Sequence, residues 1–453
     1  MYSFLCKIGE GIHVNANARI GMDALKTFGA MYELSQLSNG VTVATASMPH
    51  MSSVSLGVWV GVGGRFEPAE VSGISHFIEH MLFKGTRKRN AQQISESVEG
   101  VGGYLNAFTS EENTCFYAKA CAARLPELWM VLSDMFLNSV FDATEIEKER
   151  NVIKEELAMY LDQPQHHVHE LLNELMWPNQ PLGRSLTGTV ETLDGMSRKH
   201  LFEYLKQNYV GSTTLICVAG SVSHRDTVNL IAPLAKKLDL GRKPRFAPAH
   251  NDQESPRVRL FTKKTEQTQM VLGVRTFSRH DPQRYALRLL STMLGENMSS
   301  RLFQVVREDH GLAYSIASSI SFFDDTGDLT IGAGVETEKL PRALKLIIQE
   351  LRRLCETKPP LAELRRARDY VIGQMEMSLE NTENQMMYLG ENLLGFGKVI
   401  SPEEVKDKLF EVTPAQIRNL AERLCIPERL SLALVSPIKE SKSSEKILRS
   451  IAA

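Results

Sequence analysis

Two histidines and a glutamate stand close together in the segment His76-Phe77-Ile78-Glu79-His80. In a helix, His76 and His80 would lie one turn apart on the same face, where both imidazoles could bind one metal ion. Neutral imidazole is a common zinc ligand. Glu79 would lie beside them, within reach of a water molecule held by the metal. The order H-x-x-E-H is the inverse of the H-E-x-x-H zinc motif.

A catalytic zinc ion needs a third protein ligand, and residues 145–160 form the helix expected to supply it. Glu149 and Glu156 are seven positions apart and share one helical stripe, whereas Glu155 is rotated away by about 100°. We assign Glu156 as the ligand and Glu149 as a carboxylate that supports the site from behind. The apolar side of this helix is expected to contain Val152, Ile153 and Leu157.

Spacing alone leaves a second interpretation of this helix open. It could be an ordinary solvated helix whose acidic residues are screened by Lys148, Arg150 and Lys154. A local cluster follows, and we interpret it as a solvated helix face rather than a metal site: His166, His167 and His169.

The overall composition is that of a globular protein. The 453 residues are 43% hydrophobic and 23% charged, with a net charge of -2. The chain has no excess of basic charge, so its charge does not predict binding to nucleic acid or to an anionic membrane. The sequence contains no apolar run of about 18 residues, so it predicts no transmembrane helix. The six cysteines are scattered without a C-x-x-C pair, which favours reduced thiols and a cytoplasmic location.

The chain repeats its own pattern. Residues 53–58 resemble residues 269–274, 216 positions later, and a Leu-Pro pair opens an apolar helical run at both Leu125 and Leu340. Helices and strands do not alternate strictly, which predicts an α+β fold of two homologous domains with helices on a mostly antiparallel sheet. The expected divisions are an N-terminal extension (1–30), a metal-binding domain (31–240), a linker (241–256) and a second domain without H-x-x-E-H (257–453).

The segment from His76 to Thr86, followed by Glu149-Arg150-x-Val152-Ile153-x-Glu155-Glu156, closely resembles the pitrilysin / mitochondrial-processing-peptidase family of inverzincin metallopeptidases. The short bacterial and mitochondrial branch has chains of similar length. The 76 positions between His80 and Glu156 fit that family's third zinc ligand. The resemblance extends over about residues 32–435 and includes the duplication, so it implies a duplicated processing-peptidase-like metallohydrolase fold.

The resemblance implies further site residues. Residues 102–109 match the family's edge strand, in which Asn106, Ala107 and Phe108 would pair with the substrate backbone. In the second half, Arg307 and Tyr314 match an arginine–tyrosine pair that would bind the substrate near the scissile bond. One departure concerns Gln180, which stands before Pro-Leu-Gly-Arg where family members tend to carry a histidine.

The implied activity is that of a metallo-endopeptidase with one zinc ion per chain, held by His76, His80 and Glu156, and with Glu79 as the general base. The substrates expected are unfolded peptides or leader and targeting peptides, enclosed in a closing chamber between the two homologous domains. The chain is also expected to form a homodimer. Two alternatives stay open. The chain could be a processing subunit that needs an unlike partner, or an inactive scaffold subunit.

Overall fold

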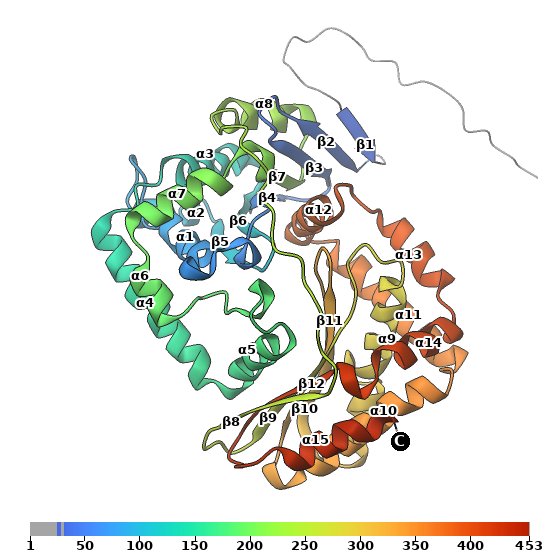
Figure 1. Cartoon of the computed structure of the whole chain (residues 1–453). Helices are drawn as coiled ribbons and strands as arrows, with labels where there is room; N and C mark the ends of the chain where they lie inside the picture. Colours follow the sequence, from blue (N-terminus) through green and yellow to red (C-terminus); the bar gives the residue numbers. More distant parts are fainter. Residues whose placement is uncertain (1–24, 29–30, 453) are drawn as a thin grey trace, which may run out of the picture.

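The computed structural model describes residues 25–28 and 31–452 and contains two β-sheets, one in each half of the chain (Figure 1). We call residues up to 240 the first half and residues from 257 the second half. The first sheet contains β1 (Leu25–Phe28), β2 (Tyr32–Gln36), β3 (Thr42–Ser47), β4 (Ser53–Val60), β5 (Tyr104–Thr109), β6 (Thr114–Cys121) and β7 (Thr214–Gly220). The second contains β8 (Arg257–Thr262), β9 (Thr268–Arg275), β10 (Ala313–Phe322), β11 (Gly327–Val335) and β12 (Leu430–Ser436).

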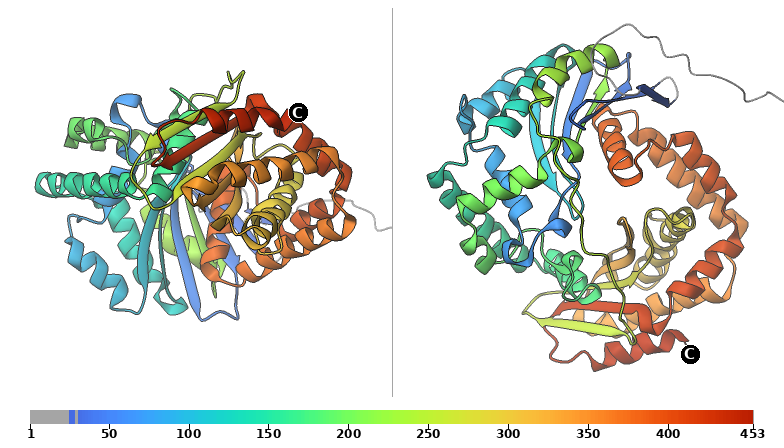
Figure 2. Two further views of the ribbon diagram at one scale, coloured as in Figure 1. Left: turned by 90° about the horizontal axis from the view of Figure 1, so that it is seen from below. Right: turned by 45° about the horizontal axis from the view of Figure 1, so that its top comes forward.

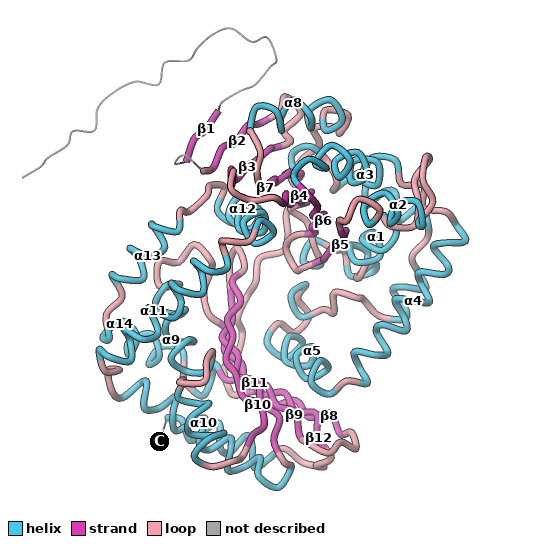
Figure 3. The backbone as a smooth tube through the Cα atoms, turned by 180° about the vertical axis from the view of Figure 1, so that it is seen from behind, coloured by secondary structure: helices cyan, strands magenta, loops and turns pink. Residues whose placement is uncertain are grey.

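Helices form most of the outer layer around the two sheets (Figure 3). Those of the first half are α1 (Ile74–Leu82), α2 (Ala91–Glu99), α3 (Leu125–Asn138), α4 (Ala143–Asp162), α5 (Pro164–Met176), α6 (Val190–Gly195), α7 (Arg198–Asn208) and α8 (His224–Ala235). Those of the second half are α9 (Arg284–Gly295), α10 (Leu340–Glu356), α11 (Leu361–Ser378), α12 (Thr382–Phe396), α13 (Pro402–Glu411), α14 (Pro414–Leu424) and α15 (Lys442–Arg449). Two shorter helical segments matter below: η1 (Gly64–Phe66) and the π-helix η6 (Phe303–Asp309).

The two sheets share one strand order, which confirms the predicted α+β fold and its duplication. The first sheet has the order β1-β2-β3-β7-β4-β6-β5, and the second has β10-β11-β9-β12-β8, so that β8 corresponds to β3 and β10 to β5. Each sheet, as far as its strands are described, has one parallel pair in the same place, between β3 and β7 and between β12 and β8, and its other described pairs are antiparallel. In both turned views the two halves lie on opposite sides of the molecule (Figure 2).

Alternation along the strands explains why each sheet buries both of its faces. In β12, Leu432 and Leu434 pack into the core formed with the second half's own helices, whereas Ala433 and Val435 point to the opposite face. Side chains of successive strand residues point to opposite faces, so a strand with both sets apolar must be covered on both sides. The second cover of each sheet comes from the other half.

Helices α5 and α12 are exchanged between the halves (Figure 1). α5 belongs to the first half but packs on β9 and β12, where Leu172 and Met176 contact Val271 and its neighbours. α12 belongs to the second half but packs on β4 and β7, where Met386 and Leu389 join the core around Trp59. The halves are therefore interlocked, and neither sheet is fully covered by its own half.

A repeated glycine makes room for each exchanged helix. A Cβ atom at Gly57 in β4 would lie 2.3 Å from Sδ of Met386, and a Cβ atom at Gly273 in β9 would lie 2.8 Å from Sδ of Met176. Gly57 and Gly273 are equivalent positions of the duplicated strand. Glycine in a strand interior often marks such a close approach.

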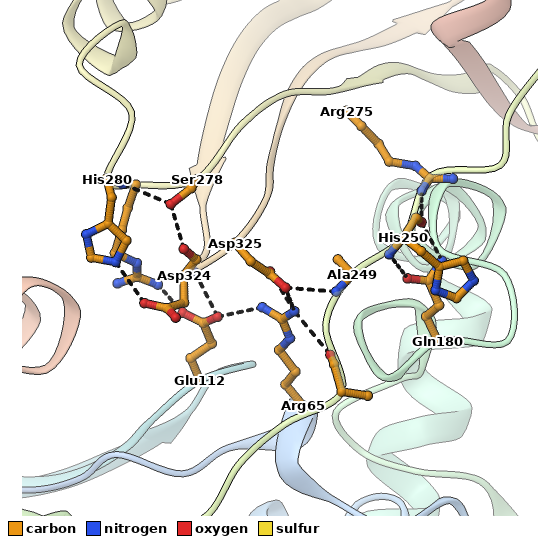
Figure 4. Close-up of polar contacts among 12 residues, drawn as sticks. Arg65, Glu112, Gln180, Ala249, His250, Arg275, Ser278, His280, Asp324 and Asp325 are labelled. Atoms are coloured by element: carbon orange, nitrogen blue, oxygen red, sulfur yellow. Dashed lines mark hydrogen bonds and ion pairs between the residues drawn. The ribbon is translucent and has the colours of Figure 1, made fainter.

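The segment between the halves, residues 241–256, contains no helix or strand and is held by side chains from both sides. The carboxamide of Gln180 donates to the carbonyl of His250 (3.0 Å) and accepts from its amide (2.9 Å) (Figure 4). Arg275 donates to the same carbonyl at 2.7 Å. Gln180 is buried, so the residue that departs from the family pattern fixes this segment from the first half. The proposed domain boundaries themselves stay a prediction.

Several expectations change in detail. Val152 is 48% exposed, so the apolar side of α4 is formed by Ile153 and Leu157 without it. The solvated-face interpretation is wrong for His167, which is buried in the exchanged helix α5 with its ring against Phe261, because this face of α5 is covered by the second sheet. The predicted extension lies outside the described residues except for β1, which pairs with β2. No helix of the described residues is both long and apolar enough to cross a bilayer.

Candidate metal centre and active site

Helix α1 carries the H-x-x-E-H motif and is fixed at its first turn by a buried carboxylate. Glu67 accepts hydrogen bonds from the backbone amides of Gly73 (2.7 Å) and Ser75 (2.8 Å), which have no partner within the helix. Gly73 has φ 93°, and a Cβ atom there would lie 2.7 Å from the carbonyl oxygen of Thr187, so this position requires glycine. The apolar face of α1 is buried, which turns the motif's polar side chains towards α4 and β5.

His76, His80 and Glu156 come together as the sequence predicts. One ligand atom of each lies within 4.8 Å of those of the other two. Oε2 of Glu156 is 3.8 Å from Nε2 of His76 and 3.6 Å from Nε2 of His80. Two atoms that are each about 2.1 Å from one ion lie at most about 4.2 Å apart, and both separations satisfy that limit. This donor set therefore fits zinc.

Glu149 supports the site from the side opposite to the three ligand atoms. Its Oε2 lies 3.1 Å from Nδ1 of His80, and its Oε1 is paired with Lys84 at 2.7 Å. Burial alone would raise the pKa of Glu149, but the hydrogen bonds from His80 and Lys84 hold that pKa below its ordinary value. An ionised Glu149 fixes the proton of His80 on Nδ1 and leaves Nε2 free to bind a metal ion. Glu149 thus holds a ligand in place rather than touching the reacting atoms.

His76 is in the neutral form that a metal ion requires. Burial, together with the nearby His80, lowers the pKa of His76 to about 4, although Glu156 opposes this effect. Nδ1 of His76 is buried and has no hydrogen-bond partner among the described residues.

Tyr160 and Thr109 complete the site, and the sequence interpretation missed both. The hydroxyl of Tyr160 donates to Oε1 of Glu156 at 2.7 Å, which leaves Oε2 directed at the histidines and raises the pKa of Tyr160 to about 12. The hydroxyl of Thr109 donates to Oε2 of Glu79 at 2.6 Å. Burial raises the pKa of Glu79, while Thr109 and His80 oppose the rise. The spacing of Tyr160, one turn after Glu156, was a usable signal.

A cavity of about 390 Å³ is lined by His76 and Glu156, two of the candidate metal ligands. It carries both cationic and acidic side chains, so it is a polar site next to the three ligands. Its other charged or titratable lining residues are Glu111, Tyr160, His166, His169, Glu170 and Arg184.

Among the described strands, β5 is an edge strand of the first sheet, and it passes beside α1. It contains Asn106, Ala107 and Phe108 and ends at Thr109, the partner of Glu79. The amide of Ala107 donates to the side chain of Asn106 (2.9 Å), so it is not engaged by the neighbouring strand β6. An extended peptide could therefore pair with this edge close to Glu79.

Arg307 and Tyr314 lie next to each other but do not contact the H-x-x-E-H motif through a hydrogen bond or ion pair. The guanidinium of Arg307 stacks over the rings of Phe303 and Tyr314, with 4.6 and 5.6 Å to their centroids, and Tyr314 is 79% exposed. Within residues 31–452, no hydrogen bond or ion pair links either of them to α1 or α4. Neither lines the cavity beside His76. Their role near the scissile bond therefore stays a prediction.

Comparison with known proteins agrees with this geometry. Residues 42–190 match the family model "Insulinase (Peptidase family M16)", and residues 195–371 match "Peptidase M16 inactive domain". A protein of Bacillus subtilis named an uncharacterised zinc protease is 38% identical, over 88% of this chain and 97% of its own length. A Streptomyces coelicolor protein of the same description is 34% identical, over 90% of both chains.

Among solved structures, a protease from Helicobacter pylori has a TM-score of 0.84 at 20% identity and covers 90% of this chain and 99% of its own. A structure from Pseudomonas fluorescens, titled as a peptidase M16 inactive domain, has a TM-score of 0.83 at 16% identity, covering 90% and 98%. At these identities the structures show the fold alone. With its duplicated fold, its H-x-x-E-H helix and its zinc-protease relatives, the chain belongs to the M16 peptidase family, also known as the pitrilysin or insulinase family.

Proposed function

We propose that this protein is an active zinc metallo-endopeptidase. The observation that carries the proposal is the convergence of His76, His80 and Glu156, with Glu79 held beside them by Thr109. A scaffold subunit has no need for a complete ligand set together with a positioned carboxylate. The relatives of this chain that are named zinc proteases support peptidase activity as well.

The chemistry follows from the roles of these side chains. A zinc ion bound by His76, His80 and Glu156, one per chain, would polarise the scissile carbonyl and make a water molecule more acidic. Glu79 would accept the proton of that water and return it to the leaving amine. Thr109 directs the carboxylate of Glu79, and Glu149 directs the ring of His80.

The free edge of β5 supports peptides as the substrate class. An extended substrate would add a strand beside Asn106, Ala107 and Phe108, using main-chain hydrogen bonds that require an unfolded segment but few particular side chains. Unfolded peptides and leader or targeting peptides satisfy this condition. A folded protein cannot present its backbone in this way.

The placement of Arg307 and Tyr314 supports a homodimer. Tyr314 is exposed and makes no hydrogen bond to α1 or α4 among the described residues, and the packing of the exchanged helices α5 and α12 opposes large movements between the halves of one chain. A second copy could bring the pair to the metal site, where Tyr314 would donate to the developing oxyanion and Arg307 would hold a substrate carbonyl. The cytoplasmic location also stays a prediction.

The first prediction tests the activity directly. The purified full-length chain should bind one zinc ion and cleave members of a diverse fluorogenic peptide library. Glu79→Gln should keep its zinc but lose about 10²–10⁴-fold in kcat/KM, the range typical of a general base. Glu155→Gln is the matched control, because Glu155 is an exposed carboxylate beside Glu156, and it should behave like the wild type.

Three results would contradict the proposal. Equal cleavage by wild type and Glu79→Gln would exclude Glu79 as the base. Stoichiometric zinc without cleavage of any peptide would favour the scaffold alternative. Cleavage that appears only after an unlike subunit is added would favour the processing-subunit alternative.

A further inference from the structure

The turn between β5 and β6, residues 110–113, is held by the backbone of η1. The amide of Gly64 donates to the carbonyl of Ser110 (3.0 Å), and the amide of Arg65 donates to the carbonyl of Glu111 (2.8 Å). The approach is so close that a Cβ atom at Gly63 would lie 2.1 Å from the oxygen of Ser110. This turn begins directly after Thr109, the residue that donates to Glu79.

One side chain of the turn, Glu112, binds groups from both halves (Figure 4). Its Oε1 accepts from Arg65 of the first half at 2.8 Å and from the amide of Asp324 of the second half at 2.9 Å. Its Oε2 accepts from Arg279 of the second half. The Glu112 side chain is only 11% exposed, and that of Arg65 only 1%. Both oxygens are therefore committed to a buried, charge-assisted contact between the halves.

Arg65 extends the same contact to the hairpin of the second half and to the linker. Its guanidinium pairs with Asp325 at 2.6 Å, in the turn between β10 and β11, and stacks over Phe246 of the linker at 3.8 Å. Asp325 in turn accepts from the amide of Ala249 at 2.8 Å. Removing one partner from such a network leaves a buried charge unpaired, which is strongly destabilising.

The network is connected to the catalytic carboxylate by two short covalent paths. Glu112 is three residues after Thr109, whose hydroxyl holds Oε2 of Glu79 at 2.6 Å. Arg65 is two residues before Glu67, whose carboxylate accepts from the first amides of α1. The contact between the halves around Glu112 and Arg65 is therefore connected both to Glu79, the proposed general base, and to helix α1, which carries it.

We propose that Glu112 is a positioning residue: by binding Arg65, Arg279 and the Asp324 amide, it holds the 110–113 turn so that Thr109 keeps the carboxylate of Glu79 in its reactive orientation. This inference rests on the proposed peptidase activity for its kinetic consequence. Its structural consequence, the fixed position of Thr109 by contact with the second half, is independent of that activity.

The kinetic test is a double-mutant cycle in the zinc-loaded, full-length enzyme. Glu112→Gln places an NH₂ group against donors, so the three contacts cannot all be kept. We expect kcat to fall about tenfold with KM nearly unchanged, since the peptide edge of β5 remains. Thr109→Val should cause a similar fall, and combining the two should lower kcat by less than about twofold more, because both act through one hydrogen bond.

The structural test uses the zinc-free protein. Hydrogen–deuterium exchange across residues 104–114 should become faster in Glu112→Gln. Glu350→Gln is the matched control: Glu350 is buried to a similar degree (4% exposed side chain) and paired with Arg353, but lies in α10 within the second half. This control should leave both exchange in residues 104–114 and kcat unchanged.

The two tests distinguish a failure of the proposed peptidase activity from a failure of the positioning role of Glu112. Faster exchange together with an inactive wild type would overturn the proposed function and leave the positioning contact standing. Unchanged exchange and unchanged kcat in Glu112→Gln would overturn the positioning role. Independent, multiplicative effects of Glu112→Gln and Thr109→Val would also overturn it, as would loss of bound zinc, since Glu112 would then act on the metal site instead.

Discussion

At the scale of residues, the sequence could group the candidate ligands and the candidate base, but not most of the side chains that hold them. His76, Glu79 and His80 share a helix, and Glu149 and Glu156 share a stripe, so helical periodicity alone groups them. The partners from other elements, Thr109 and Glu67, depend on how strands and loops pack around α1. No spacing in the chain reveals such contacts.

The role of Glu149 gives a second prediction. Replacing Glu149 with Gln removes the charge that fixes the proton of His80 on Nδ1, so zinc affinity should fall about 10–100-fold, as is usual for such supporting carboxylates. Competition with a chelator measures the affinity. Excess zinc should restore most of the cleavage, whereas a Glu79→Gln enzyme should not recover. Unchanged affinity would mean that Glu149 serves only its ion pair with Lys84.

A third prediction concerns a buried carboxyl group of the second half. Burial raises the pKa of Asp328 to about 7, and the nearby Glu111 of the first half adds to the rise. The folded state therefore keeps a proton that the unfolded state loses above about pH 4, so the free energy of unfolding falls as pH rises from about 4 to about 7.

Asp328→Asn, which resembles the protonated side chain, isolates this effect. At pH 8 the variant should melt at least about 3 °C above the wild type, and near pH 4 the two should melt together. Thermal unfolding measured across this pH range is the appropriate experiment. A constant difference at every pH would show that Asp328 is not titrating in this window.

At the scale of elements, individual helices and strands were largely predictable, but their partners were not. The predicted helix at 145–160 is α4, and the apolar runs after Leu125 and Leu340 are α3 and α10. The exchange of α5 and α12 could not be foreseen, because an amphipathic helix carries no information about which of two equivalent sheets it covers. The same exchange explains the burial of His167.

A fourth prediction tests this packing through two helical glycines. A Cβ atom at Gly390 in α12 would lie 2.1 Å from the buried ring of Trp59, so Gly390→Ala should lower the free energy of unfolding by about 1–3 kcal/mol. Gly373 in α11 has open space around it, and Gly373→Ala should instead stabilise the protein by up to about 1 kcal/mol. Denaturant titration distinguishes the two signs. Equal effects would place Trp59 outside a tightly packed contact.

At the scale of the whole molecule, the two halves carry different groups of polar side chains. The first half carries the candidate metal ligands and base, and the second carries the stacked Arg307 and Tyr314 and the contacts to Glu112. The duplication was predictable from repeated patterns. The interlocking of the halves through α5 and α12 was not, because it depends on which sheet each helix covers.

A fifth prediction follows for the homodimer. Glu79→Gln and Tyr314→Phe should each be nearly inactive alone. If Tyr314 acts on the metal site of the partner, random exchange of subunits in an equal mixture should restore about a quarter of wild-type activity, because half of the dimers then contain one intact site of two. If Tyr314 acts within its own chain, no activity should return. Size-exclusion chromatography before mixing checks that both variants form dimers.

The exchange of α5 and α12 also has a consequence for how the chain is made. The last strand of the first sheet, β7, ends at Gly220, but its cover α12 begins only at Thr382, about 160 residues later. At about 5–20 residues per second, the ribosome needs roughly 10–30 s to synthesise this stretch. During that time the face of the nascent sheet around Trp59 has no partner from its own chain, so newly made chains depend on protection from aggregation until their second half emerges.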